Sequence, residues 1–448
     1  MVVCRKILRN PVAAGERPVD SRMARLQAEH IVIVGAGAAG LMAASELGRR
    51  GRAVTILEAR DRCGGRIYPL PATEFGYPAA GGAEFVHGEA PVTRSLLRQA
   101  GLALVPLQGS RWAVENRNLV RGQAENPHES ELHNALQELK NDVPIAEFLR
   151  SHFAGPRYDR LRRSIERMAE GYDAADPERA STLALRDEWM DGGRNTQARI
   201  AGGYGSLIDF LVAECRRVGT AIRLGSAVTA IEPTDRDGHR VRCANGETFG
   251  ADIVVLTLPP PLLQQMALPD VVRNRAAAVA HIGYGNVIKI LLRFETCWWT
   301  DCRADLHDLG FLHSDAPIPV WWTQFPDPRP VLTGWFGGPK TQAMSHLDEH
   351  QLIDAGLASL AENFNLAPGQ LKQSLVAARS IDWGRDPFAR GAYSYATVHT
   401  RDAQAALART EGSAVFFSGE ALYRGKDMGT VEAALASGLE TARIILRG

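Results

Sequence analysis

The sequence predicts an α/β fold in which a parallel sheet is assembled from segments far apart in the chain. The first observation is the apolar, β-branched run 31–34, which leads into a glycine-rich turn and a helical segment ending near residue 51. The second is another apolar strand at 54–57 that ends in an acidic residue. The third is the return of buried strands at 253–257 and 414–418. This order of elements is typical of a Rossmann-type dinucleotide domain.

The glycines of the turn have different expected roles. Gly35 makes the tight turn after the strand, Gly37 lets the backbone approach a pyrophosphate, and Gly40 lets helix and strand pack closely. The phosphates then lie at the helix N-terminus, where unpaired N–H groups favour anions. Glu58 is placed to accept hydrogen bonds from a ribose. A glycine turn without a ligand is the alternative, and the ordered succession of strand, glycines, helix, strand and acid disfavours it.

Composition limits the function classes. The 448 residues suffice for two or three domains, and 51 basic residues balance 51 acidic ones, so no overall field recruits nucleic acid or an anionic membrane. No run approaches the roughly 18 apolar residues of a spanning helix. The six cysteines match no zinc spacing, so we predict no metal site and reduced thiols in a cytoplasmic protein. Residues 1–29 have no signal-peptide core and are expected to form a disordered extension.

The remaining chain alternates between two domains. Residues 30–90, 200–283 and 384–448 are assigned to the dinucleotide domain, and residues 91–199 and 284–383 to a substrate domain. Segment 91–199 is charged and mainly helical, with helices expected near 131–140 and 158–170 and little strand character. The second segment has strands rich in aromatic residues, which predicts a mixed sheet. The fold is therefore a nucleotide domain interleaved with a mixed-sheet domain carrying a helical insertion.

The segment that follows Glu58 distinguishes the cofactor. It reads Glu-Ala-Arg-Asp-Arg-Cys-Gly-Gly-Arg over residues 58–66 and resembles the E-A-x-x-R-x-G-G-R extension of the flavin amine oxidase superfamily. In that superfamily the glycines and arginines pass the pyrophosphate and approach the flavin. The resemblance therefore implies FAD, with Arg60, Gly65 and Arg66 among the residues that bind it.

Further motifs resemble the same superfamily, in its order, over most of residues 30–448. They are the loop GGAEFVHG at 81–88, the strand around 289, the string WGRDPFARGAYSY at 383–395 and the segment from residue 419 into the last helix. Polyamine oxidases and the oxidase domain of lysine-specific histone demethylases are the most similar members. The resemblance implies a cofactor site that includes Gly82, Ala83, Glu84, Val228, Trp383, Gly419, Glu420, Thr430 and Val431.

Three residues are the expected catalytic set. Lys289, one of only six lysines, stands in an apolar strand and matches the lysine that assists reoxidation beside flavin N5 in the family. A gatekeeper lysine on an edge strand is the alternative. Tyr393 matches the aromatic wall of the amine site, and His87 falls where polyamine oxidases place a histidine or acid. Either residue could instead be an ordinary loop or core side chain whose hydrogen bonds are made within the protein.

Two departures from the family modify the expected site. Ala392 stands where covalent monoamine oxidases have a flavin-linked cysteine, which implies non-covalent FAD. Thr430 stands at the second aromatic wall position, so no two-ring sandwich is expected. L-amino-acid oxidases place an arginine where Phe85 stands, which disfavours a free amino acid. A histone is disfavoured because 91–199 resembles no long coiled-coil tower.

The resemblance implies an FAD-dependent amine oxidase that converts a primary or secondary amine, polyamines included, to an imine by hydride transfer to flavin N5, with oxygen reduced to hydrogen peroxide. The expected partners are a small amine and oxygen, without nucleic acid or membrane, in a monomer or homodimer. A flavin dehydrogenase or desaturase of the phytoene or protoporphyrinogen oxidase type is the main alternative. An L-amino-acid oxidase and a non-catalytic flavoprotein are the others.

Overall fold

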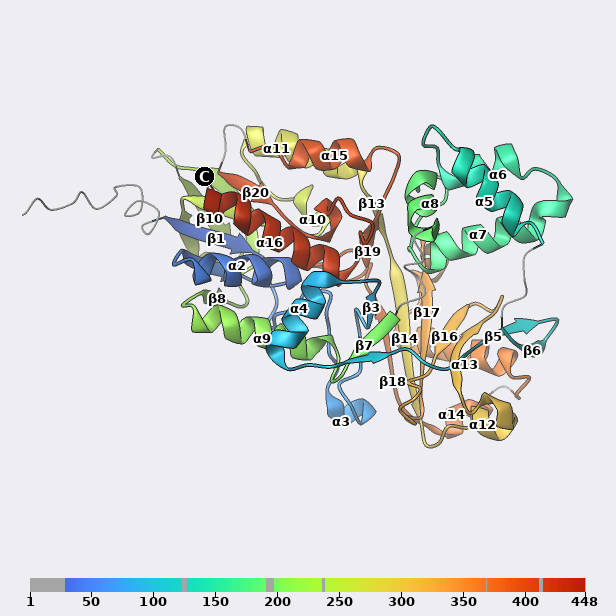
Figure 1. Cartoon of the computed structure of the whole chain (residues 1–448). Helices are drawn as coiled ribbons and strands as arrows, with labels where there is room; N and C mark the ends of the chain where they lie inside the picture. Colours follow the sequence, from blue (N-terminus) through green and yellow to red (C-terminus); the bar gives the residue numbers. More distant parts are fainter. Residues whose placement is uncertain are drawn as a thin grey trace, which may run out of the picture.

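We analysed a computed structural model of the chain, which describes residues 29–122, 127–190, 197–235, 238–367, 369–410 and 414–447. Two lobes lie side by side, one around β1 and α2 and the other around β14 and the helices α5–α8 (Figure 1). The expected disordered extension, apart from residue 29, lies outside the described residues.

The first lobe contains a five-stranded sheet in the order β20-β12-β1-β2-β8. Every neighbouring pair is parallel. The strands are β1 (His30–Val34), β2 (Ala53–Leu57), β8 (Ala221–Arg223), β12 (Ile253–Leu256) and β20 (Val415–Phe417). The central strands β1, β2 and β12 are mainly apolar because helices or a second sheet cover both faces of the sheet, whereas the edge strand β8 is largely exposed. The parallel sheet expected from the sequence is confirmed.

Helices pack on one face of this sheet, and a smaller sheet covers the other. The first group comprises α2 (Ala38–Arg49), α4 (Pro91–Ala100), α9 (Tyr204–Arg217) and α16 (Val431–Arg447). Helices α2 and α16 touch closely, since a Cβ added to Gly438 would lie 2.2 Å from the carbonyl oxygen of Ala39. The second group comprises β9 (Val228–Pro233), β10 (His239–Cys243), β11 (Thr248–Ala251), α10 (Pro260–Leu263), α11 (Asp270–Ala276) and α15 (Thr400–Leu407).

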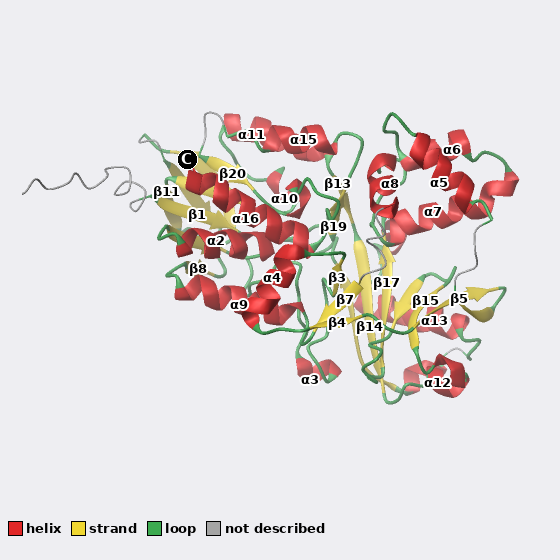
Figure 2. Cartoon of the chain, in the orientation of Figure 1, coloured by secondary structure: helices red, strands yellow, loops and turns green. Residues whose placement is uncertain are grey.

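The second lobe is built on a seven-stranded mixed sheet in the order β18-β14-β17-β16-β15-β5-β6. Its strands are β5 (Ser110–Glu115), β6 (Asn118–Arg121), β14 (Val287–Phe294), β15 (Leu309–His313), β16 (Val320–Trp322), β17 (Val331–Gly337) and β18 (Leu375–Asp382). Figure 2 shows these strands beside the helices of the insertion. The short helices α12 (Trp299–Cys302) and α14 (Gln370–Gln373) and the longer α13 (Glu349–Asn363) pack against the sheet, and Asp348 begins α13 with a capping box.

Segment 91–199 is more varied than its composition indicates. The helices α5 (Glu129–Glu138) and α7 (Asp159–Gly171) confirm the two that were expected, and α6 (Ile145–His152) and α8 (Thr182–Met190) join them around a core of their own. The segment also supplies β5 and β6 to the large sheet. The expectation of little strand character was wrong here because these strands are short and half-exposed, so they lack the apolar runs that reveal a buried strand.

Two small sheets connect the lobes. One joins β3 (Phe85–His87), β7 (Gln197–Ile200) and β4 (Leu104–Pro106), and the other pairs β13 (Gly283–Gly285) with β19 (Tyr393–Tyr395). The short helix α3 (Ala72–Phe75) lies below β3 and β7 in Figure 1. Both small sheets bring candidate site residues to the space between the lobes. Among the described residues, no helix has the length and apolar content needed to cross a membrane.

Candidate active site

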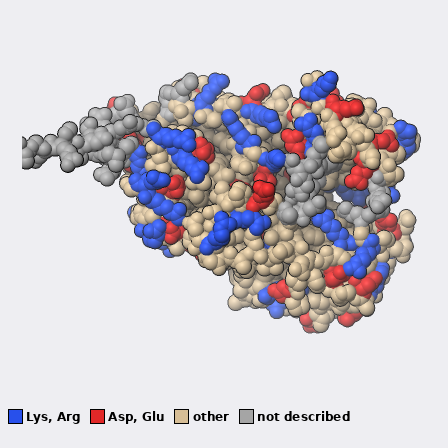
Figure 3. All heavy atoms as spheres, viewed as in Figure 1, with Lys and Arg blue, Asp and Glu red and all other residues tan. Residues whose placement is uncertain are grey.

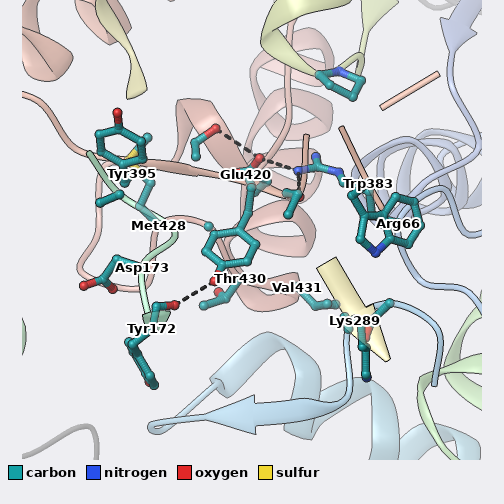
Figure 4. Close-up of a pocket in the computed structure, with 18 of the residues that line it drawn as sticks. Arg66, Tyr172, Asp173, Lys289, Trp383, Tyr395, Glu420, Met428, Thr430 and Val431 are labelled. Carbon is teal, nitrogen blue, oxygen red and sulfur yellow. Dashed lines mark hydrogen bonds and ion pairs between the residues drawn. The ribbon is translucent and has the colours of Figure 1, made fainter. Parts of the chain in front are cut away.

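A cavity of about 1400 Å³ extends from the glycine turn after β1 to the aromatic face of the mixed sheet. Its walls include the turn at 35–39, the loop at 82–87, Lys289, Tyr393 and the start of α16. Figure 4 shows how Arg66, Trp383, Lys289, Glu420, Thr430 and Val431 surround its central part. Positive and negative side chains are intermixed on the face of the molecule in Figure 3, in keeping with the balanced charge of the chain.

The glycine turn has the geometry that its spacing predicts. Gly35 has φ +106°, which favours glycine, and a Cβ on Gly40 would lie 2.0 Å from the carbonyl oxygen of Gly35. A Cβ on Gly37, in contrast, would meet no atom of the described part of the chain within 4 Å. Because Gly37 lines the cavity just before the N-terminus of α2, a side chain there would enter space that a pyrophosphate can use.

Glu58 lies buried at the end of β2, on the cavity wall. Its carboxylate accepts hydrogen bonds from the backbone N–H groups of Ala36, at 2.7 Å, and Arg60, at 2.9 Å. These two bonds fix the acid beside the glycine turn, where it can also accept from the hydroxyls of a ribose. The side chain of Arg60 turns to Asp386 and forms an ion pair with it, so Arg60 supports the wall through that contact.

Arg66 and Glu420 form a pair at the centre of the cavity. Arg66 Nη1 donates to Glu420 Oε1 at 2.8 Å and to the carbonyl of Ala392 at 2.7 Å, and Ser394 Oγ donates to the same Glu420 oxygen. The other carboxylate oxygen of Glu420 is buried and has no hydrogen-bond partner among the described residues. A buried oxygen of this kind requires a donor. The hydroxyls of an FAD ribityl chain supply one, so the residues present fit the cofactor.

The other predicted cofactor residues also reach this cavity. Gly65, with φ +58°, lies against the α carbon of Gly37. Gly82 touches the Trp383 ring, whose Nε1 donates to the carbonyl of Gly81 at 3.3 Å. The cavity lining further includes Ala83, Val228, Gly419, Thr430 and Val431. Thr430 Oγ1 accepts from the N–H of Ala433, so Thr430 begins α16 as a helix cap.

Lys289 is fully buried on β14, which lies between β17 and β18, and this placement excludes the edge-strand alternative. Its Nζ donates to Glu84 Oε2 at 2.8 Å and to the carbonyl of Gly82 at 3.1 Å. Glu84 Oε1 receives Arg199 Nε at 3.0 Å, and it also accepts from Trp322 and Gln324. The Glu84 carboxylate therefore accepts hydrogen bonds from two cationic and two neutral donors.

The pKa values in this cluster follow from its composition. Burial lowers the pKa of Lys289, and Arg199 lowers it further, while Glu84 acts in the opposite direction. Burial raises the pKa of Glu84, but the two cations outweigh this and hold the pKa of Glu84 at about 2. Glu84 is therefore ionised at neutral pH. The sequence placed Glu84 with the cofactor residues, and the structure joins its carboxylate to Lys289.

Tyr393 and His87 meet through Tyr172, a residue of the loop after α7. Tyr393 Oη donates to the carbonyl of Tyr172 at 2.7 Å, and the Tyr172 hydroxyl lies 3.0 Å from His87 Nδ1. Gln197 Nε2 lies 3.2 Å from the same nitrogen. Because an amide N–H can only donate, Nδ1 is the acceptor and the imidazole proton is on Nε2. Burial lowers the pKa of His87 to about 4, so the ring is neutral at pH 7.

Sequence reasoning missed several residues of this site. Trp335 stacks on Tyr393 with ring centroids 6.4 Å apart and an interplanar angle of 21°, and Trp322 lies 5.8 Å from Trp335. Arg199 reaches Glu84 from β7, and Gln324 reaches it from the loop after β16. The available signal was the set of aromatic pairs in 298–336, which indicated an aromatic sheet without showing which rings face the cavity.

A parallel nucleotide domain, a fitted FAD cavity and a mixed sheet with a buried lysine define a flavoprotein oxidoreductase. Residues 38–446 match the family described as Flavin containing amine oxidoreductase, and the chain belongs to that family. It is an enzyme whose cofactor is FAD.

The relatives agree with this membership. The chain is 26% identical to "Probable polyamine oxidase 4" of Arabidopsis thaliana, over 88% of this chain and 82% of that protein. It is 25% identical to human lysine-specific histone demethylase 2, of which it spans about half (53%) while 92% of this chain is covered.

Two solved structures share the fold. One is a putrescine oxidase with putrescine bound, with TM-score 0.74, 20% identity and coverage of 94% of this chain and 99% of that one. The other is the cyclohexylamine oxidase of Brevibacterium oxydans IH-35A, with TM-score 0.73, 20% identity and the same coverage of both chains. At these identities the likeness concerns the fold.

Proposed function

We propose that the enzyme oxidises a primary or secondary amine, polyamines included, to an imine, with oxygen reduced to hydrogen peroxide. The observation that carries this proposal is the position of buried Lys289 and the Tyr393 ring on one cavity with the FAD residues. When bound, FAD accepts a hydride from the carbon next to the amine nitrogen and passes the electrons to oxygen.

The residues of the chain supply binding, orientation and charge. Tyr393 and Trp335 present ring faces to an amine in the cavity. His87 is neutral and adds no positive charge that would repel the amine. Lys289 forms a buried ion pair with Glu84, so its positive charge lies at the cavity wall, shielded from water. Desolvation by the aromatic wall favours the neutral amine, which is the form with a nitrogen lone pair.

The remaining assignments support the same proposal. Glu58 and the glycine turn would hold the adenosine and pyrophosphate end of FAD, and Arg66 with Glu420 would hold its ribityl region. The backbone N–H groups at the start of α16, next to Thr430 and Val431, form the positive end of a helix dipole. They would stabilise the negative charge of the reduced flavin ring. We also propose the two interleaved domains at the stated boundaries and a cytoplasmic location.

The test is anaerobic mixing of the purified holoenzyme with amines, polyamines and amino acids, followed by absorbance of the oxidised flavin. An amine should bleach the flavin, and air should restore it with peroxide released. If no amine bleaches it while a polyene or porphyrinogen does, the desaturase alternative replaces this proposal. If only amino acids bleach it, the enzyme is an amino-acid oxidase.

A further inference from the structure

We propose that the physiological substrate is a monoamine with an apolar, ring-sized body, and that a polyamine is a poor substrate. This inference rests on the proposed amine oxidation and adds the substrate class. It is carried by two features of the cavity, the continuity of its aromatic wall and the saturation of the carboxylate nearest to Lys289.

The aromatic wall runs without a break across five strands, β3, β15, β16, β17 and β19. Phe85 of β3 lies 5.3 Å from Trp322 of β16, and Phe311 of β15 lies 6.0 Å from Phe85, measured between ring centroids. Trp322 continues to Trp335, which stacks on Tyr393. All five rings line the cavity. Such a surface favours flat or apolar groups, and it can hold one ammonium by cation–π attraction.

The acid on this wall is not free to hold a second ammonium. Each Glu84 oxygen already receives a cationic donor, Lys289 on one side and Arg199 on the other, and Oε1 also accepts from Trp322 and Gln324. A polyamine with its second ammonium beside Glu84 would bury that charge without a free acceptor, which is costly. A monoamine meets no such cost.

The charges at the far side of the cavity act in the same direction. Arg111 and three arginines of α7, namely Arg160, Arg163 and Arg167, contribute to the lining there. Asp315 pairs with Arg167, and Glu115 lies 3.7 Å from Arg160, so the arginines exceed the acids of this group by two. A surplus of positive charge lowers the local concentration of a polycation more than that of a monocation.

Three acids line the cavity beyond Tyr172, and they would bind the second ammonium if the substrate were a polyamine. They are Asp173, Glu188 and Asp427, and Asp173 lies beside Tyr172 in Figure 4. Burial, followed by the neighbouring Glu432 and Glu188, raises the pKa of Asp427 and weakens it as a counter-ion. Burial raises the pKa of Tyr393, and Asp173 and Glu188 raise it further, so these two acids lie near the Tyr393 end of the aromatic wall. If the substrate were a polyamine, its remote ammonium would have to be held there.

The first test compares substrates on the wild-type holoenzyme. Benzylamine and cyclohexylamine should reduce the flavin with kcat/KM at least about tenfold above that of putrescine or spermidine, since about 1.4 kcal/mol of differential binding gives a factor of ten. Putrescine or spermidine as the better substrate would overturn the inference and leave amine oxidation intact. Failure of every amine would instead remove the proposed function itself.

The second test uses matched variants of Trp335. Trp335→Ala should lower kcat/KM for benzylamine about tenfold, mainly through KM, and should change that for propylamine by less than about threefold. Trp335→Phe keeps a ring and should restore most of the benzylamine value. Asp173→Asn should leave benzylamine unaffected. A specific loss of spermidine turnover in Asp173→Asn, with Trp335→Ala unchanged toward benzylamine, would contradict the assignment.

Discussion

The ammonium nitrogen of Lys289 lies 2.8 Å from a carboxylate oxygen of Glu84, and both side chains are shielded from solvent. The pairing affects the pKa values of the two groups differently. Glu84 faces two cations, so its pKa falls despite burial, whereas Lys289 gains one acid but loses water and is repelled by Arg199. A lone buried lysine would lose its proton far more readily. Glu84 therefore helps to keep a positive charge at the cavity wall.

Replacement of Lys289 should separate cofactor binding from oxygen use. Lys289→Met keeps the length of an apolar side chain, so we expect the FAD content to stay unchanged while reoxidation of the reduced enzyme by oxygen slows by about 100-fold, the order seen when one preorganised active-site donor is removed. Stopped-flow absorbance measures this rate. Lys372→Met, which removes an exposed partner of Asp354, is the control. Unchanged oxygen kinetics would remove Lys289 from the mechanism.

Replacement of Glu84 should move the pH dependence of the same step. In Glu84→Gln the group that raises the pKa of Lys289 is lost, while burial and Arg199 continue to lower it. The lysine then loses its proton at lower pH, so the alkaline decline of the reoxidation rate should begin at lower pH than in the wild type. Asp354→Asn provides a surface carboxylate control. An unshifted profile together with a raised KM for the amine would mean that Glu84 binds substrate instead.

Two glycines of the same turn allow a paired test of the cofactor site. Gly37→Val should fold, because its Cβ meets no atom of the described residues within 4 Å, but should lose FAD, measured as the ratio of flavin to protein absorbance. Gly40→Val should fail to fold stably, because its Cβ would lie 2.0 Å from the carbonyl oxygen of Gly35. Thermal unfolding of the apoproteins distinguishes the two effects. Full flavin content in Gly37→Val would place the pyrophosphate elsewhere.

The nature of the FAD linkage follows from Ala392. This residue has no nucleophilic side chain, and its backbone carbonyl accepts from Arg66. Heat denaturation should therefore release essentially all flavin into the supernatant, where its fluorescence can be measured after centrifugation. Flavin that remains with the precipitate would show a covalent link through another residue.

The sequence predicted the nucleotide half better than the substrate half for a physical reason. The glycine turn and Glu58 act through local backbone geometry, which fixed spacing encodes. Lys289 could be recognised because a charge in the middle of an apolar strand is rare. Its partner Glu84 is 205 positions away along the chain, and Arg199, which binds the same carboxylate, is 90 positions away. The pairing of β3 with β7 brings Glu84 and Arg199 side by side.

The aromatic wall could not be assigned from the sequence for a related reason. Trp322 lies on β16 and Trp335 on β17, and these two strands pair with each other. Which face of the sheet each tryptophan occupies depends on the register, because a shift of one residue moves every side chain of a strand to the opposite face. Thr430 has no ring to offer, and nothing in the sequence showed that Trp335, on another strand, stacks on Tyr393. The domain boundaries stay predictions.

His87 should make the stability of the protein depend on pH between about 6.5 and 4. Burial lowers the pKa of His87 from 6.5 to about 4, so in this window the unfolded chain binds a proton that the folded protein does not. The free energy of unfolding should therefore fall as the pH decreases, by up to about 3 kcal/mol from this group, and the contribution is fully present above pH 6.5. Urea unfolding at pH 7 and pH 4.5 measures it.

The matched variants for this effect are His87→Asn and His307→Asn. An asparagine at position 87 can still bond to Tyr172 and Gln197 but does not titrate, so the difference in unfolding free energy between the two pH values should shrink relative to the wild type. His307 is exposed, and its replacement should leave the difference unchanged. If His87→Asn shows the full wild-type difference, the imidazole is protonated in the folded protein and would carry a positive charge toward the incoming amine.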